Sequence, residues 1–442
     1  MRKNILLATT TLVAAFTLAA TAQAGDRTQL QDLQAQIQAL QAQVNALQAQ
    51  QADEARAEQD AAVQEQSRLL KVEKGGWWAN TSVSGRMYYD LSYIDNQHTN
   101  GAITSKDNQN GVSFDIKRFY VGIDHTFDSV YSANVTTDFQ YSSNISSTEL
   151  FLKKAYLQAK YDDAFTVRAG AADMPWIPFV EDIYGYRYID KTLIDRTNFG
   201  TSSDWGVHIL GKLFDGMLNY QVSVVDGNGY KKPATGTANR TDTMDVEGRV
   251  NLNVSDFTVA VGGYFGQLGT ANNTHVFNDA ERFDALAAYH HDGIRVGVEY
   301  FSTNDWFDVN TVPVAGSPPD PTSKANGISA FASYQFSPEW GVFGRYDYVK
   351  PYDTYQNTTT AAGEAKVESY KNNYYNVGIS YSPTKIVDFA LVYKHETGDD
   401  GCFSDGNGLI GSPSCTLSTG AGFGSGQSGK YDEIGLYGQF RW

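Results

Sequence analysis

The sequence predicts an all-β fold, a 16-stranded antiparallel transmembrane β-barrel that follows an N-terminal periplasmic coiled-coil helix. Short segments with alternating apolar and polar side chains recur from Thr81 to Trp442, with the period of two that marks a two-faced strand. Their connections are alternately short and long, as in outer-membrane barrels with tight periplasmic turns and long external loops. After the first 24 residues no stretch approaches the ~20 apolar residues of a spanning helix, so spanning requires a closed barrel.

The pattern gives sixteen strand segments. They are 81–94, 112–127, 130–141, 148–161, 164–171, 204–213, 217–226, 243–254, 256–268, 281–291, 294–303, 326–336, 340–349, 374–382, 386–396 and 430–442. Short connections such as 128–129 and 292–293 alternate with long ones such as 172–203. An even strand count places both chain ends in the periplasm.

The N-terminal segment predicts export. Arg2 and Lys3 precede an apolar run over 5–20, and Ala22-Gln23-Ala24 fits a small-residue cleavage site. We therefore expect a signal peptide over 1–24, a periplasmic arm over 25–74 and an outer-membrane barrel over 75–442.

The arm carries a heptad pattern. Its apolar seam consists of Leu30, Leu33, Ile37, Leu40, Val44 and Leu47. The flanking positions are glutamines, so the apolar stripe is narrow, which favours a self-associating coiled coil over a helix in a globular core. Ile and Val at one seam position with Leu at the other favour two strands.

Composition excludes several functions. The net charge of -16 argues against nucleic-acid binding. The sequence has no nucleophile elbow, phosphate loop or zinc spacing, and adjacent His290 and His291 would point to opposite faces of a strand. We expect no enzyme, cofactor or metal.

Cys402 and Cys415, in one Gly- and Ser-rich stretch of an exported chain, predict a disulfide that closes a loop.

The charged side chains predicted to face the lumen are nearly balanced. The basic ones are Arg86, Arg118, Lys154, Lys160, Arg168, Lys212, Arg249, Arg295, Arg345, Lys394 and Arg441. The acidic ones are Asp90, Asp124, Asp138, Asp245, Glu247, Glu299, Asp347, Asp388, Glu396 and Glu433. The sequence thus predicts a lumen of mixed charge.

Loop 172–203 is the predicted constriction. Its candidate residues are Trp176, Glu181, Asp182, Tyr184, Tyr186, Arg187, Tyr188, Lys191 and Arg196. Charges at a constriction select the sign of an ion, and aromatic faces can stack on sugar rings. Equally, the aromatic side chains can simply pack the loop against the wall.

Several segments resemble the phosphate-selective porin family of the O and P type. They are FDIKRFYVG from Phe114 to Gly122, Lys154 to Leu157, Val167 to Gly170, Asp204 to Val207, Val225 to Gly229 and Gly344 to Tyr348. Phe440 and Trp442 at the chain end resemble the terminal signal read by the barrel-assembly machinery.

The resemblance implies a 16-stranded, trimeric porin that lets small hydrophilic solutes diffuse passively, with phosphate or other anions first. A sugar porin is the alternative, and a structural tether between outer membrane and cell wall is another class. The expected partners are two further copies of the chain, outer-membrane lipid and lipopolysaccharide, the barrel-assembly machinery, and peptidoglycan through the arm.

Overall fold

The structure is a computed structural model with two compact units, Met1–Ala79 and Asn80–Trp442. It describes residues 38–41, 43–44, 76–100, 103–106, 110–142, 147–233, 240–270, 278–306, 309, 323–357, 365–366, 371–399 and 427–442. Cys402, Cys415, the predicted signal peptide and most of the predicted seam lie outside these residues. Residues 38–41 and 43–44 are helical, with the seam residues Leu40 and Val44 exposed. Among the described residues, no helix is long and apolar enough to cross a membrane.

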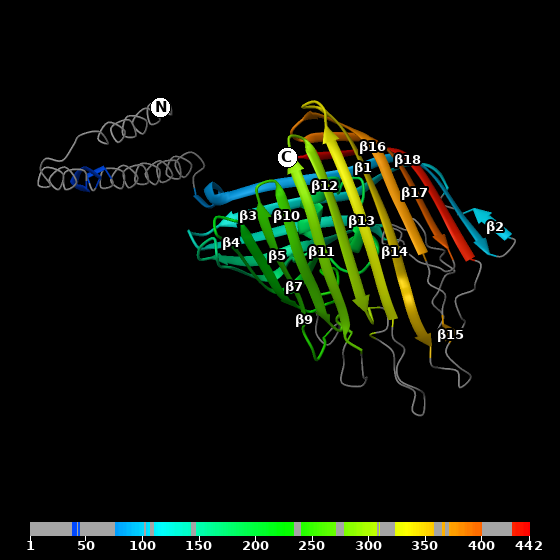
Figure 1. Ribbon diagram of the computed structural model, residues 1–442, viewed down its shortest axis with the longest axis horizontal. Coiled ribbons are helices and arrows are strands. Elements are labelled where there is room, and N and C mark those ends of the chain that lie inside the picture. The colour runs from blue at the N-terminus through cyan, green and yellow to red at the C-terminus, as the bar shows by residue number, and fades with distance from the viewer. Residues whose placement is uncertain are drawn as a thin grey trace, which may run out of the picture. The chain divides into compact units, whose positions relative to one another are not determined.

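Sixteen long antiparallel strands form the barrel wall (Figure 1). They are β1 (Thr81–Asn100), β3 (Gly111–Thr126), β4 (Tyr131–Ser142), β5 (Ser147–Lys160), β6 (Thr166–Asp173), β7 (Ser203–Leu213), β8 (Leu218–Val225), β9 (Asp245–Val254), β10 (Phe257–Gly266), β11 (Ala280–His291), β12 (Ile294–Asn304), β13 (Ser323–Gln335), β14 (Trp340–Asn357), β16 (Lys371–Thr384), β17 (Val387–Asp399) and β18 (Gln427–Arg441). Each predicted segment corresponds to one of them, so the predicted fold class is confirmed.

Three short elements were not predicted. A 3-10 helix, η2 (Gly76–Asn80), precedes β1, while β2 (Ile103–Lys106) pairs with the outer end of β1 and β15 (Ala365–Lys366) with that of β14. They add structure outside the wall without changing the strand count of the barrel.

The first and last strands close the barrel. β1 pairs with β18 from Arg86↔Arg441 to Asn100↔Gln427. Beyond that register, Gly85 and Trp442 exchange two backbone hydrogen bonds of 3.1 Å. A Cβ at Gly85 would overlap the Trp442 ring, so only glycine permits this approach. Closure leaves β1 and β18 without a free edge along the shared register.

The outer face of the wall is apolar. Val259, Val261 and Leu391 are more than half exposed at alternate positions of their strands. Exposed aromatic side chains such as Phe214 and Phe336 gather at the tight turns. An apolar band bounded by aromatic rings is the surface that a bilayer requires of a barrel.

Candidate functional site

The loop between β6 and β7 folds into the barrel. It contains α3 (Ile177–Tyr184) and α4 (Leu193–Arg196). Pro178 near the start of α3 suits a first helical turn, and Gly185 ends the helix with φ at 79°. Buried apolar residues of the loop, including Trp176 and Phe199, pack against Phe301 and neighbouring wall residues. Apolar burial therefore fixes the loop inside the lumen.

Four cations of the wall hold the loop backbone. Arg282 donates to Phe199 O at 2.5 Å, Arg295 to Tyr184 O at 3.2 Å, and Lys394 to Ile189 O at 3.1 Å. Arg345 donates to Lys191 O. Tyr184 is the last residue of α3, so Arg295 also places a positive charge at the negative end of the helix.

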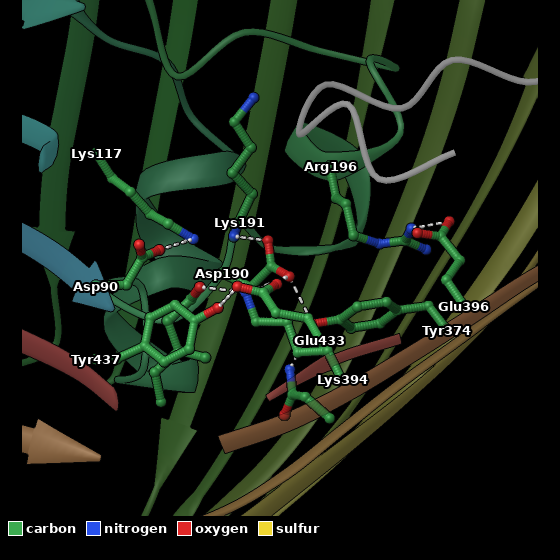
Figure 2. Close-up of polar contacts among 12 residues, drawn as sticks. Asp90, Lys117, Asp190, Lys191, Arg196, Tyr374, Lys394, Glu396, Glu433 and Tyr437 are labelled. Atoms are coloured by element: carbon green, nitrogen blue, oxygen red, sulfur yellow. Dashed lines mark hydrogen bonds and ion pairs between the residues drawn. The ribbon is translucent and has the colours of Figure 1, made fainter. Parts of the chain in front are cut away.

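Two charged side chains of the loop enter the opposite wall (Figure 2). Arg196 makes ion pairs with Asp347 at 3.0 Å and Glu396 at 2.9 Å, and all three side chains are fully buried. Asp190 accepts a hydrogen bond of 2.5 Å from the Tyr374 hydroxyl. Burial alone would raise the pKa of Asp190, but the nearby cations, Lys394 first, hold this pKa well below its ordinary value. Asp190 therefore stays ionised and keeps its partners.

These contacts correct part of the predicted constriction. Trp176, Tyr184, Tyr188 and Arg196 are almost completely buried, because the loop uses them to bind the wall. Tyr186 stacks on Phe343 of the wall, with 4.3 Å between the ring centroids. These aromatic side chains therefore pack the loop against the wall, as the alternative prediction has it, and they do not line a channel.

Four further predicted loop residues are not fully buried: Glu181, Asp182, Arg187 and Lys191. Arg187 pairs with Glu181 at 2.5 Å, and Lys191 lies 3.5 Å from Asp195. Asp182 is exposed and makes no ion pair with any residue that the structure describes. The surrounding barrel still partly desolvates the Asp182 carboxyl, which raises its pKa, and the neighbouring carboxylates of Glu181 and Asp173 raise this pKa further.

Two bulges in the wall turn extra lysines inward. The register of β3 against β1 shifts between Tyr88 and Tyr89, and Lys117 reaches the inward-facing Asp90 at 2.8 Å. The register of β5 against β4 shifts between Thr136 and Thr137, and Lys153 reaches Ser202 of the inner loop at 3.1 Å. A regular strand would point only Arg118 and Lys154 inward, so strict alternation missed Lys117 and Lys153.

The inward acids and bases differ in accessibility. Nine of the ten predicted lumen acids are buried, the exception being Asp124. Of the eleven predicted lumen bases, only Arg345 and Lys394 are buried. Arg345 was predicted to line the pore, but it lies beneath the loop, bound to Asp347. The predicted balance of charge therefore holds for the whole inner face and fails for its accessible part.

Two cavities flank the loop. The one toward the tight turns, about 740 Å³, is lined by five bases, Lys160, Arg168, Lys212, Arg249 and Arg295, and three acids, Asp163, Asp182 and Asp256. The one toward the long loops, about 360 Å³, is lined by six bases, Arg118, Lys153, Arg187, Lys191, Lys231 and Lys232, and one acid, Asp195. Both are predominantly basic. Arg86, also predicted to line the pore, is exposed on the lumen side of β1.

Aromatic rings orient several accessible bases. Lys153 Nζ lies 5.2 Å from the centroid of the Tyr120 ring and 5.3 Å from that of Tyr230. The guanidinium of Arg249 lies 4.0 Å from the Phe179 centroid. A ring holds a cation through its quadrupole without cancelling the net charge. These bases are thus held in place and remain available to anions.

The described residues include no group of three or more His, Cys, Asp or Glu side chains placed to hold a metal ion. At the chain end, Phe440 and Trp442 are exposed, and their rings stack with centroids 5.5 Å apart.

No protein-family model and no curated protein matches the chain. Among solved structures, the anion-selective porin of Comamonas acidovorans is 12% identical over 81% of this chain and 99% of its own, with a TM-score of 0.55. The trimer form of OmpT, an outer membrane protein of Vibrio cholerae, is 12% identical over 82% and 99%, with a TM-score of 0.50. The outer membrane channel DcaP of Acinetobacter baumannii is 12% identical over 80% and 96%, with a TM-score of 0.49. The likeness to the first two of these structures shows that the chain has the porin fold.

Proposed function

We propose that the protein is an outer-membrane porin, a passive, water-filled channel that prefers small hydrophilic anions. The observation that carries this proposal is the separation of charge in the lumen. Most of the inward acids of the strands are buried against the loop and the wall, whereas most of the bases remain accessible on both sides of the loop. A passing ion responds to the accessible charges, and rings of Arg and Lys favour anions.

The net charge of the chain does not oppose this preference. At physiological ionic strength, screening limits the range of a surface charge to about 8 Å. Many acids of the chain lie outside the lumen. Asp128, Asp162 and Asp215, for example, are exposed in the tight turns. The local charge of the passage therefore determines which ion enters.

A neutral sugar is less well supported. Sugar rings need open aromatic faces, but Trp176, Tyr184 and Tyr188 are almost fully buried. Within the anion class, phosphate is the first candidate, because the sequence segments that resemble phosphate-selective porins include Arg118 and Arg168, and both line the cavities.

We also propose a homotrimer in the outer membrane, exported by the signal peptide, with the arm as a periplasmic coiled coil. The trimer form of OmpT and the heptad pattern of the arm support self-association. The terminal aromatic residues Phe440 and Trp442 support assembly by the barrel machinery.

The test is the reversal potential of the purified protein in a planar bilayer under a potassium chloride gradient. We expect a potential of the sign given by chloride permeation, and a smaller current when phosphate is added. A potential of the opposite sign would exclude anion preference, and the absence of conductance would exclude a porin.

A further inference from the structure

We propose that the barrel has a side portal between β3 and β4, through which an amphipathic anion passes between the lumen and the outer surface of the membrane. A split in the wall carries this inference. β3 pairs with β4 only from Val121↔Thr137 to Thr126↔Ser132, and both strands continue outward beyond this register. Along these outer parts, the facing edges of the two strands share no ladder pair among the described residues.

The outer ends of β4 and β5 form a ribbon of two strands, 138–142 and 147–154. They pair with each other as far as Ser142↔Ser147, whereas β5 pairs with β6 only up to Ala155. In the part of the chain that the structure describes, the ribbon therefore pairs with no third strand. β3 stays paired with β1 to its outer end, so the split separates the ribbon from a strand that is anchored in the wall.

The two bulges of the wall flank the split and explain why it opens. Lys117 is the extra residue of β3 relative to β1, and Lys153 is the extra residue of β5 relative to β4. A bulge bends its strand and increases the local twist. The edges of β3 and β4 therefore diverge beyond the bulges.

The split begins near the outer edge of the apolar band. Its inner end is marked by Phe119 and Phe139, whose ring centroids lie 5.8 Å apart across the two strands. Arg118 lies nine residues from Phe127, an exposed ring at the tight turn. At about 3.3 Å per residue and a tilt of about 40°, this distance rises about 23 Å, close to the ~25 Å height of the band. Backbone groups without partners cannot face acyl chains, so the free edges lie where water reaches them.

A cavity of about 560 Å³ occupies the split. Phe114, Ile116 and Phe139 line it, and Phe114 and Ile116 are exposed on the outer face of β3. Lys117 and Arg118 line its inner side. An apolar outer flank next to a charged inner flank fits a molecule with an apolar tail and a charged head.

Arg118 connects this portal to the lumen, because it also lines the cavity between the inner loop and the long loops. The charges of the portal itself do not select an anion. Lys117 pairs with Asp90 at 2.8 Å, and Asp115 also lines the portal. Arg118 pairs with Asp138 at 3.2 Å. The sign of the head group is therefore set by the basic cavity behind the portal, and this part of the inference rests on the proposed anion preference.

Lys153 is placed to hold the head group. It stands on the ribbon and lines the basic cavity. Its Nζ donates to Ser202 Oγ at 3.1 Å and makes no ion pair with a described acid. A carboxylate can therefore bind Lys153 inside the barrel while its apolar tail leaves through the split.

The test uses decanoate with a photoreactive diazirine on its last carbon, added to the full-length protein in lipid nanodiscs. After illumination, the labelled residues are mapped by mass spectrometry of peptides. We expect the segments 112–119 and 137–142 to be labelled at least about fivefold more than the outward faces of β10 and β11, because binding adds to simple dissolution in lipid. Equal labelling of all outward faces would overturn the proposal.

Variants and a second probe test the head group. Lys153→Gln should lower labelling of the portal about fivefold, since one charge close to the carboxylate changes binding by this factor in water. Lys385→Gln is the control, because Lys385 is exposed in a tight turn outside the lumen, and it should be labelled like the parent. Unchanged labelling in Lys153→Gln, or equal labelling of the parent by a decylamine with the same diazirine, would overturn the anionic head. The reversal potential tests the anion preference of the channel separately.

The remaining occupant of the split is a second copy of the chain. Ile116→Cys treated with a short bismaleimide reports it, because a covalent dimer forms only if another copy covers the portal. We expect no dimer. A dimer together with an unlabelled portal would overturn the proposal.

Discussion

Replacing Arg196 with Met should loosen the inner loop from the wall. The guanidinium occupies a site where its own side chain and those of Asp347 and Glu396 are fully buried. Removing it takes the Arg196 charge from the buried Glu396 and leaves the buried Asp347 with Arg345 as its ion-pair partner. Breaking a buried ion pair by removing one partner costs about 3–5 kcal/mol, far more than the pair is worth relative to apolar replacements.

The expected cost predicts a rate of hydrogen exchange. If the loop opens locally, about 3–5 kcal/mol corresponds to roughly 10²- to 4 × 10³-fold faster exchange of the amides that opening exposes. The Thr197 amide, which donates to Leu193 O at 3.1 Å, is one such reporter. Hydrogen exchange read by mass spectrometry on peptides of this loop measures the effect, and wall peptides of β10 and β11 report whether the barrel remains folded.

Arg187→Met is the matched control in the same loop. Arg187 also pairs with two acids, Glu181 and Asp195, but its side chain is 16% exposed. Pairs in contact with solvent contribute about 0–1 kcal/mol, so exchange should rise by less than about fivefold. The anchoring role of Arg196 would be refuted if both variants exchanged at the same rate while the wall peptides stayed protected.

Three further predictions concern ion preference, each read from reversal potentials in a planar bilayer. Lys153→Gln removes a positive charge that makes no ion pair with a described acid. A passing anion about 5 Å from this charge interacts with it by about 1 kcal/mol in water, so anion preference should fall about two- to fourfold. An unchanged reversal potential would contradict this prediction. Partial desolvation and neighbouring acids raise the pKa of Asp182, so lowering the pH toward about 4 should protonate it early and increase anion preference. Asp182→Asn should show this increase already at neutral pH, and a lower anion preference in that variant would contradict the assignment. Partial burial first, and then the cations Arg118 and Lys191, lower the pKa of Lys231 to about 8, so anion preference should fall as the pH rises through 8, and Lys231→Gln should lack that step.

The fold could be predicted because its rule is local. Alternation of apolar and polar residues can be read from consecutive residues of one segment. Every strand of the barrel shows it, because each has lipid on its outer face and water on its inner face. This is why all sixteen strands were found, although β1 and β14 extend to Asn100 and Asn357, beyond their predicted ends. Those outer ends carry no apolar face that would mark them.

The bulges could not be predicted in this way. Lys117 and Lys153 turn inward because each strand gains a residue relative to its partner, and that offset is a property of two paired strands. Pairs of adjacent bases, Lys117-Arg118 and Lys153-Lys154, were visible in the sequence. A regular period of two assigned one member of each pair to lipid, which is an improbable place for a charge.

The sequence by itself determined the strands, their inner and outer faces and the near balance of charge on the inner face, because these follow from the order of residues along single strands. Only the tertiary structure decided which of those charges meet water. The inner loop covers acids such as Glu247, Asp347 and Glu396 and leaves bases such as Lys153, Arg168 and Arg249 accessible. Burial depends on contacts between distant segments, as between Arg196 and Glu396, and no local pattern encodes such contacts.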